Sequence, residues 1–237
     1  MKNKNDIFIL RHDVDSPFVY RKSKTKKILN RIFLSNPEIP GKEKLPGYLE
    51  ALKHTIKLEK KFNARGTFFL RTVTCPTHEF VEHMLNEGHE IGFHADKIDT
   101  FQDFNKDLEF IKNKINHTIL GFSKHGFAKI RSGGEWNEKQ MIEYAISAKL
   151  KYLAQGVDHP DWEKPQLIDG VYVFGHHLTI KDATFQELEK YVQSNSCPML
   201  MLHPEDLYID GVEDKFINIL KLAKAISVKD ALKQMVS

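Results

Sequence analysis

Two aspartates, Asp13 and Asp15, follow the short apolar run 7–10 and are separated by one residue. In an extended segment, residues two apart point the same way, so both carboxylates can face one site. One carboxylate can bind a metal ion while the other takes a proton from water, whose pKa a metal ion lowers toward about 7. The alternative is a turn or a helix cap that uses the aspartate side chains. We favour a metal-assisted hydrolytic site, because no helix-cap pattern follows the apolar run.

Histidines end two further strand-like segments. His94 closes the segment 89–94, where an imidazole is either a metal ligand or a hydrogen-bonding group of the strand end. His203 follows the apolar segment 199–202, where a partly desolvated histidine can act as a general acid. Glu205 or Asp206 could orient His203, but we interpret both as caps of the turn that follows.

Strand-like and helix-like segments alternate along the chain, which is typical of an α/β fold with mainly parallel strands. The expected strands are 7–10, 66–70, 89–94, 120–122, 152–154, 170–174 and 199–202, and the expected helices are 46–61, 77–86, 99–115, 137–148, 185–193 and 212–225. Such a series suits a complete or distorted (β/α) barrel, whose active site gathers at the carboxyl ends of the strands. The polar clusters should therefore converge, and residues 19–46 look like an inserted excursion.

The composition is that of an ordinary globular protein, with 237 residues, 41% hydrophobic residues, 28% charged residues and a formal net charge of +3. We expect one domain over 1–237. Basic residues crowd into 21–31, which we interpret as a solvated face, with a phosphate or membrane-surface contact as the alternative. Neither a broad basic surface nor a nucleic-acid-binding motif is evident, so no nucleic-acid partner is expected.

The cysteines and the apolar runs indicate the kind of site and the cellular location to expect. Cys75 and Cys197 form no CxxC pair, which argues against a disulfide framework and against a thiolate zinc site. The segment 1–13 lacks the features of a signal peptide, and no apolar run approaches the ~20 residues that span a bilayer. A cytoplasmic location without an integral membrane segment is the resulting expectation.

Taken in order, several segments resemble the polysaccharide deacetylase (NodB-homology) group of carbohydrate esterases, which fold as a distorted (β/α)7 barrel. Residues 11–15 (RHDVD) resemble a variant of the family's first motif, and 64–70 resemble its ATFF strand. Residues 88–94 match its GHEIGxH run, and 200–204 resemble its Leu-x-His segment. By this resemblance Asp13 is the general base, Asp15 and His94 bind the metal, and His203 is the catalytic acid.

The sequence departs from the family pattern at several positions. The family's second metal histidine falls four residues after the first, where this chain has Ile98. His125, in the loop after the next strand, is our candidate replacement, whereas Asp96 would need a different backbone path. The family's arginine-containing third motif is missing in its usual form, although Arg131 could contact the substrate or the base. Trp162 could form a wall against a sugar ring, with local packing as the alternative.

The resemblance implies a metal-dependent hydrolase that removes an N-acetyl group from an N-acetylated sugar or glycan precursor. The mixed nitrogen and oxygen ligands favour zinc, with cobalt, manganese or nickel as alternatives. Two other functions stay open. One is hydrolysis of another C–N bond in a small metabolite by the same fold; the other is carbohydrate binding without catalysis, which Ile98 motivates.

Overall fold

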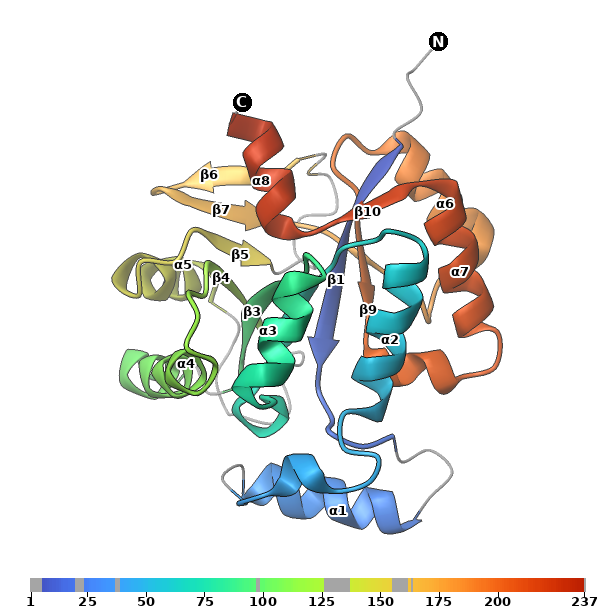
Figure 1. Cartoon of the computed structure of the whole chain (residues 1–237). Helices are drawn as coiled ribbons and strands as arrows, with labels where there is room; N and C mark the ends of the chain where they lie inside the picture. Colours follow the sequence, from blue (N-terminus) through green and yellow to red (C-terminus); the bar gives the residue numbers. More distant parts are fainter. Residues whose placement is uncertain are drawn as a thin grey trace.

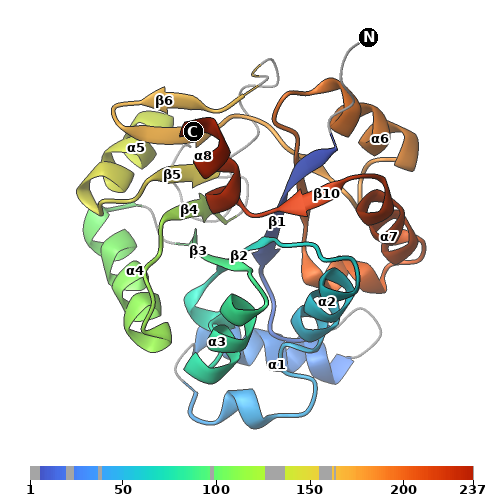
Figure 2. The ribbon, with the colours of Figure 1, turned by 45° about the horizontal axis from the view of Figure 1, so that its top comes forward.

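The computed structural model describes residues 6–19, 24–36, 39–96, 99–125, 137–154, 162 and 164–236, and Arg131 and Ile98 lie outside them. Within this part of the chain, strands and helices alternate around one strongly curved sheet (Figure 1). In the turned view, most helices lie around the outside of the strands, whereas the helix Val228–Val236 lies over one end of the sheet (Figure 2). The α/β class and the distorted barrel expected from the sequence are confirmed.

The described residues form a sheet of ten strands in the order β6-β7-β5-β4-β3-β2-β1-β9-β8, with β10 paired to β1. All neighbours are parallel except β6 and β7. The strands are β1 (Ile7–Val14), β2 (Thr67–Leu70), β3 (Glu90–Ala95), β4 (Gly121–Lys124), β5 (Tyr152–Ala154), β6 (Gln166–Ile168), β7 (Val171–Phe174), β8 (Leu178–Thr179), β9 (Met199–Leu202) and β10 (Lys224–Ile226). The seven expected strands are all present, and the short strands β6, β8 and β10 are additional.

The helices are α1 (Lys24–Ser35), α2 (Glu50–Lys61), α3 (His78–Asn86), α4 (Phe101–Ile115), α5 (Glu138–Ser147), α6 (Phe185–Ser194), α7 (Val212–Leu222) and α8 (Val228–Val236). The six expected helices correspond to α2 to α7, whereas α1 and α8 were not expected. The helix expected over 212–225 stops earlier, because Ala223 has an extended backbone and β10 follows it to pair with β1. No described helix is long and apolar enough to cross a membrane.

Strand β1 is longer than its apolar run, because it continues through the charged motif to Val14. The segment 11–14 pairs with β2 on one side, and 9–12 pairs with β9 on the other, so the motif lies in the middle of the sheet. Charged side chains can occupy this buried position only when partners compensate them. Arg11 and Asp13 pair with each other, and His12 meets Glu59 of α2.

The side chains of β1 point alternately toward the surrounding helices and toward the inside of the curved sheet. Phe8 and Leu10 pack outward against the helices, whereas Ile9 belongs to the core inside the curve of the sheet. Because successive side chains of a strand point to opposite faces, Arg11 and Asp13 share the inner side with Ile9. The curved sheet thereby directs the odd-numbered residues of the motif toward its own interior.

Candidate active site

The carboxylate of Asp13 is held by an arginine of the same strand. Arg11 donates through Nε to Asp13 Oδ1 at 2.8 Å and through Nη2 to Oδ2 at 2.6 Å, and both side chains are buried. The guanidinium also donates to the backbone carbonyl of Ala154 and lies over the ring of Phe69. Burial by itself would raise the pKa of Asp13, but the charge of Arg11, aided by His94, holds that pKa well below its usual range. Asp13 is therefore an ionised carboxylate.

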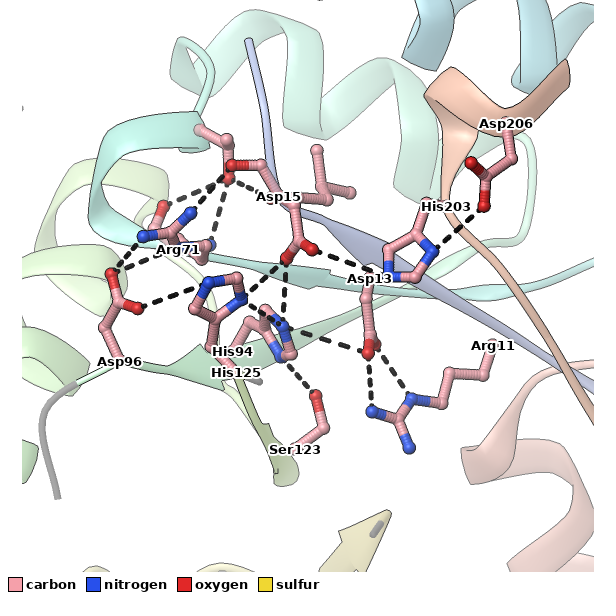
Figure 3. A network of polar contacts seen from close by, with 12 residues as sticks. Arg11, Asp13, Asp15, Arg71, His94, Asp96, Ser123, His125, His203 and Asp206 are labelled. Atoms are coloured by element: carbon pink, nitrogen blue, oxygen red, sulfur yellow. Dashed lines mark hydrogen bonds and ion pairs between the residues drawn. The ribbon is translucent and has the colours of Figure 1, made fainter. Parts of the chain in front are cut away.

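Three atoms that can bind a metal converge beside Asp13 (Figure 3). Asp15 Oδ1 lies 3.1 Å from His94 Nε2 and 2.9 Å from His125 Nδ1, and the two ring nitrogens are 3.2 Å apart. Neighbouring ligands of a tetrahedral zinc ion with bonds of 2.0–2.1 Å are about 3.3 Å apart. The residues present thus fit a divalent ion in both ligand type and spacing.

The register between β3 and β4 explains how His125 reaches this position. His94 lies opposite Ser123 in the sheet, and the backbone N–H of His125 donates to the carbonyl of Ala95 at 2.8 Å. His125 therefore lies just beyond the end of β4, beside the end of β3. A residue about thirty positions away in sequence thus meets the imidazole of His94.

Polar neighbours surround the ligand group. Ser123 Oγ lies 2.7 Å from His94 Nδ1, so a proton on Nδ1 leaves Nε2 free to bind a metal. Arg71 donates to Asp96 through Nε at 3.0 Å and to the carbonyl of Asp15 through Nη1 at 2.8 Å. Asp96 Oδ1 in turn lies 3.9 Å from His125 Nε2. Asp96 is thus a neighbour of His125 and not a member of the converging group.

His203, at the end of β9, faces the same group from the other side (Figure 3). Its Nε2 lies 3.4 Å from Asp15 Oδ2, and its Nδ1 lies 3.1 Å from Asp206 Oδ2. Burial would lower the pKa of His203, but the hydrogen bond to Asp206 and the charges of Asp15 and Asp13 raise it to about 9. The ring is then protonated at neutral pH. Asp206, which we interpreted as a turn cap, instead contacts the histidine.

Most of the site residues named from the sequence lie close together, namely Asp13, Asp15, His94, His125 and His203. Trp162 is partly buried and packs against the core between the sheet and the helices, in line with the local-packing alternative. Arg131 lies outside the described residues, so its expected contact stays a prediction.

Arg11 is a site residue to which we assigned no role from the sequence, where Arg131 was the candidate for contact with the base. The sequence could have indicated this contact, because a residue two positions before Asp13 on a strand points to the same face as Asp13. The signal is weak by itself, since an arginine at a strand end is usually solvated. Only the structure shows that Arg11 is buried and that its guanidinium pairs with Asp13.

If His125 is a ligand, replacing it with alanine is expected to weaken zinc binding by about 100-fold or more, because one of the three residues that can bind the ion is lost. Competition with a chelating dye measures the affinity. The control is His83→Ala, which removes an exposed histidine of α3 and should leave the affinity unchanged. Equal affinities of the two variants would exclude His125 as a ligand.

No protein-family model and no curated protein matches the chain. Among solved structures, it is similar to one described as a probable polysaccharide deacetylase from Pseudomonas aeruginosa PAO1, with a TM-score of 0.62, 11% identity, and coverage of 96% of this chain and 89% of that one. It is also similar to the Xyl-CE4 domain of a multidomain xylanase from the hindgut metagenome of Trinervitermes trinervoides, with a TM-score of 0.52, 12% identity, and coverage of 98% and 91%.

A third similar structure is a CE4 family pseudoenzyme from Bacillus anthracis, with a TM-score of 0.54 and 14% identity over 97% of this chain. The chain spans 66% of the length of that protein. The chain therefore has the polysaccharide deacetylase fold of the CE4 type, as the resemblance of its motifs implies. Because this fold is found in a pseudoenzyme as well, any inference about activity depends on the residues of the site.

Proposed function

We propose that this chain is a metal-dependent hydrolase that removes an N-acetyl group from an N-acetylated sugar or glycan precursor. The observation that carries the proposal is the convergence of a metal-ligand group, an arginine-held carboxylate and a carboxylate-paired histidine at one end of the sheet. These residues lie at or just beyond the carboxyl ends of β1, β3, β4 and β9, which are brought together only by the fold. Perturbed ionisable groups gathered in this way are typical of catalytic sites.

Asp15, His94 and His125 would hold the divalent ion. Their mixed nitrogen and oxygen donors favour zinc, and cobalt, manganese or nickel are the alternatives. A divalent ion at this position would polarise an acyl carbonyl and lower the pKa of water. Hydrogen bonds and the charges of His125 and His94 hold the pKa of Asp15 well below its usual range despite burial, so Asp15 is ready to bind a cation without first losing a proton.

Asp13 and His203 would move the protons. Asp13 Oδ2 lies 3.8 Å from His94 Nε2, which places the carboxylate beside the ligand group where it can accept a proton from water. Both of its oxygens accept hydrogen bonds from Arg11, but each carboxylate oxygen has a second lone pair. His203, kept protonated by Asp206, would donate the proton of Nε2 to the nitrogen that leaves.

The N-acetylated sugar is the substrate that the fold and the motif resemblance support. The same proton transfers would serve hydrolysis of another amide, so a small N-acyl metabolite is the alternative substrate. Carbohydrate binding without catalysis is a second candidate function for this chain, because one of the similar structures is a pseudoenzyme. The retention of base, ligands and acid together favours catalysis.

Metal removal tests the proposal directly. The chelator-stripped protein, incubated with oligomers of N-acetylglucosamine, should release no acetate, and addition of zinc, cobalt, manganese or nickel should restore release. Release from small N-acyl compounds but not from the oligomers would contradict the carbohydrate substrate. Absence of release from any acylated compound by protein shown to contain metal would contradict hydrolysis, and sugar binding by that protein would favour the non-catalytic function.

A further inference from the structure

Helix α1 presents a face that is both basic and apolar. Ile28 and Ile32 are 57% and 45% exposed, and Lys24, Lys27 and Arg31 are exposed beside them. Their spacings of three and four residues place all five side chains on one side of the helix. The helix contains no acidic residue. These five residues are called the basic α1 face below.

The opposite side of α1 is firmly attached to the protein. Phe33 is buried and stacks on Phe18, with 5.3 Å between the ring centroids. Asn30 accepts from the backbone N–H of Phe18 at 3.0 Å and donates to its carbonyl at 2.6 Å. The face of α1 that packs against the protein is thus the one with Asn30 and Phe33. Ile28 and Ile32 lie on the opposite face and are exposed there.

Charge on this helix is only partly neutralised. Lys26, on the flank of the attached side, pairs with Glu50 at 2.9 Å. Among the described residues, no carboxylate lies within ion-pair distance of Lys24, Lys27 or Arg31. The basic α1 face thus combines positive charges that no described carboxylate neutralises with two large apolar side chains.

The basic α1 face lies on the active-site side of the molecule. Asn30 of α1 donates a hydrogen bond to the carbonyl of Phe18, which follows Asp15 by three residues. Figure 1 shows α1 beyond the carboxyl end of β1, the end at which Asp13 and Asp15 lie. A partner bound to α1 would therefore be next to the end of the sheet that carries the site.

We propose that the basic α1 face docks onto an anionic membrane surface. A helix with lysine or arginine around exposed isoleucines lies in the plane of the interface, with its apolar side chains between the lipid headgroups and its cations on anionic phosphates. A nucleic acid or another soluble polyanion would match the cations but would leave Ile28 and Ile32 without a role. The combination of charge and apolar exposure favours the bilayer.

Sedimentation with lipid vesicles tests docking without any measurement of hydrolysis. The intact protein should bind vesicles made of phosphatidylglycerol and phosphatidylcholine in equal parts, and should bind far less to pure phosphatidylcholine. Raising the salt concentration should weaken binding, because screening shortens the reach of the cations. Failure of the wild-type protein to bind the anionic vesicles would overturn the proposal, whatever its activity on acetylated sugars.

Reversing the charge of two lysines on the basic α1 face tests whether electrostatic attraction to anionic lipids contributes to binding. The double variant Lys24→Glu, Lys27→Glu should bind anionic vesicles at least about 25-fold more weakly, at roughly fivefold per cation removed. The matched control is Lys190→Glu, Lys221→Glu, which changes the net charge equally at exposed positions of α6 and α7. Equal loss in both double variants would mean that net charge alone causes binding, and would overturn the assignment to α1.

Removing the apolar part separates a bilayer from a soluble polyanion. The double variant Ile28→Ser, Ile32→Ser should bind vesicles roughly tenfold more weakly, because less apolar surface enters the interface. The control Ile146→Ser, Leu167→Ser alters side chains that are 45% and 60% exposed elsewhere and should bind as the wild type does. Unchanged binding by the α1 variant, together with equal binding to a single-stranded oligonucleotide, would overturn the membrane proposal. Circular dichroism during heating verifies that all variants are folded.

Discussion

Replacing Asp13 with asparagine is expected to lower kcat for acetate release by about 10²–10⁴-fold, the usual contribution of a general base. Asparagine keeps the shape of the side chain but cannot accept a proton from water. Asp13 lies outside the converging ligand group, so the variant should still bind zinc. Steady-state acetate release and the metal content of the purified variant give the two measurements.

The matched control is Asp182→Asn, which makes the same change at an exposed aspartate. It should keep wild-type kcat and wild-type metal content. Ordinary turnover by a metal-loaded Asp13→Asn variant would exclude Asp13 as the base. Loss of both metal and activity would instead place Asp13 among the ligands and contradict the proposed division between Asp13 and Asp15.

Replacing Arg11 with methionine is expected to lower the free energy of unfolding at neutral pH by about 3–5 kcal/mol, because it leaves a buried carboxylate without its counter-charge. Methionine keeps much of the apolar length of the arginine but supplies neither the charge nor the two hydrogen bonds to Asp13. Urea unfolding measures the loss. An equal midpoint for variant and wild type would show that Asp13 does not depend on Arg11.

The same variant has a pH signature whose sign follows from the pKa of Asp13. That pKa is well below its usual range in the folded protein, so the pair stabilises the fold above the unfolded pKa of about 3.9, and this contribution is lost as the pH falls toward the lower folded value. The difference in stability between wild type and Arg11→Met should therefore shrink in acid. In the variant, burial raises the pKa of Asp13 unopposed by Arg11, so the acidic limb of the pH–rate profile should move to higher pH.

Two further variants distinguish charge from geometry. Arg11→Lys keeps the charge but loses the two-point hydrogen bond, so its acidic limb should lie between those of the wild type and Arg11→Met. Arg65→Met removes an exposed arginine and should change neither the profile nor the stability by much. An acidic limb in Arg11→Met at the wild-type position would contradict control of the base by Arg11.

The residues that end strands show how far the sequence alone could go. The apolar run at 7–10 predicted a buried parallel strand, because a strand covered on both faces has a nearly continuous run of apolar residues. Parallel strands then require their carboxyl ends to lie at one edge, which predicted that His94 and His203 would meet Asp13. The two-residue spacing of Asp13 and Asp15 also predicted a shared face, since that spacing is a property of the extended backbone itself.

Helix α1 and strand β10 were not predicted, for a physical reason. Ile28, Leu29, Ile32 and Phe33 of α1 do have helical spacing, but the basic residues and the prolines around them favoured an inserted excursion over 19–46. Strand β10 continues an apolar pattern of helical spacing and becomes a strand because the edge of Ile7–Ile9 is open to pair with it. Tertiary pairing thus overrode the local pattern.

At the candidate site, the sequence by itself determined the residue types, the strand ends that carry them and the common face of Asp13 and Asp15. Only the tertiary structure decided that His125 lies beside His94, that Asp206 pairs with His203, and that Arg11 holds Asp13. Periodicity along a chain is a local property of the backbone, whereas the register between strands depends on contacts among residues far apart in sequence. Which side chains share a buried space, and how their charges shift one another's pKa, follows from that register.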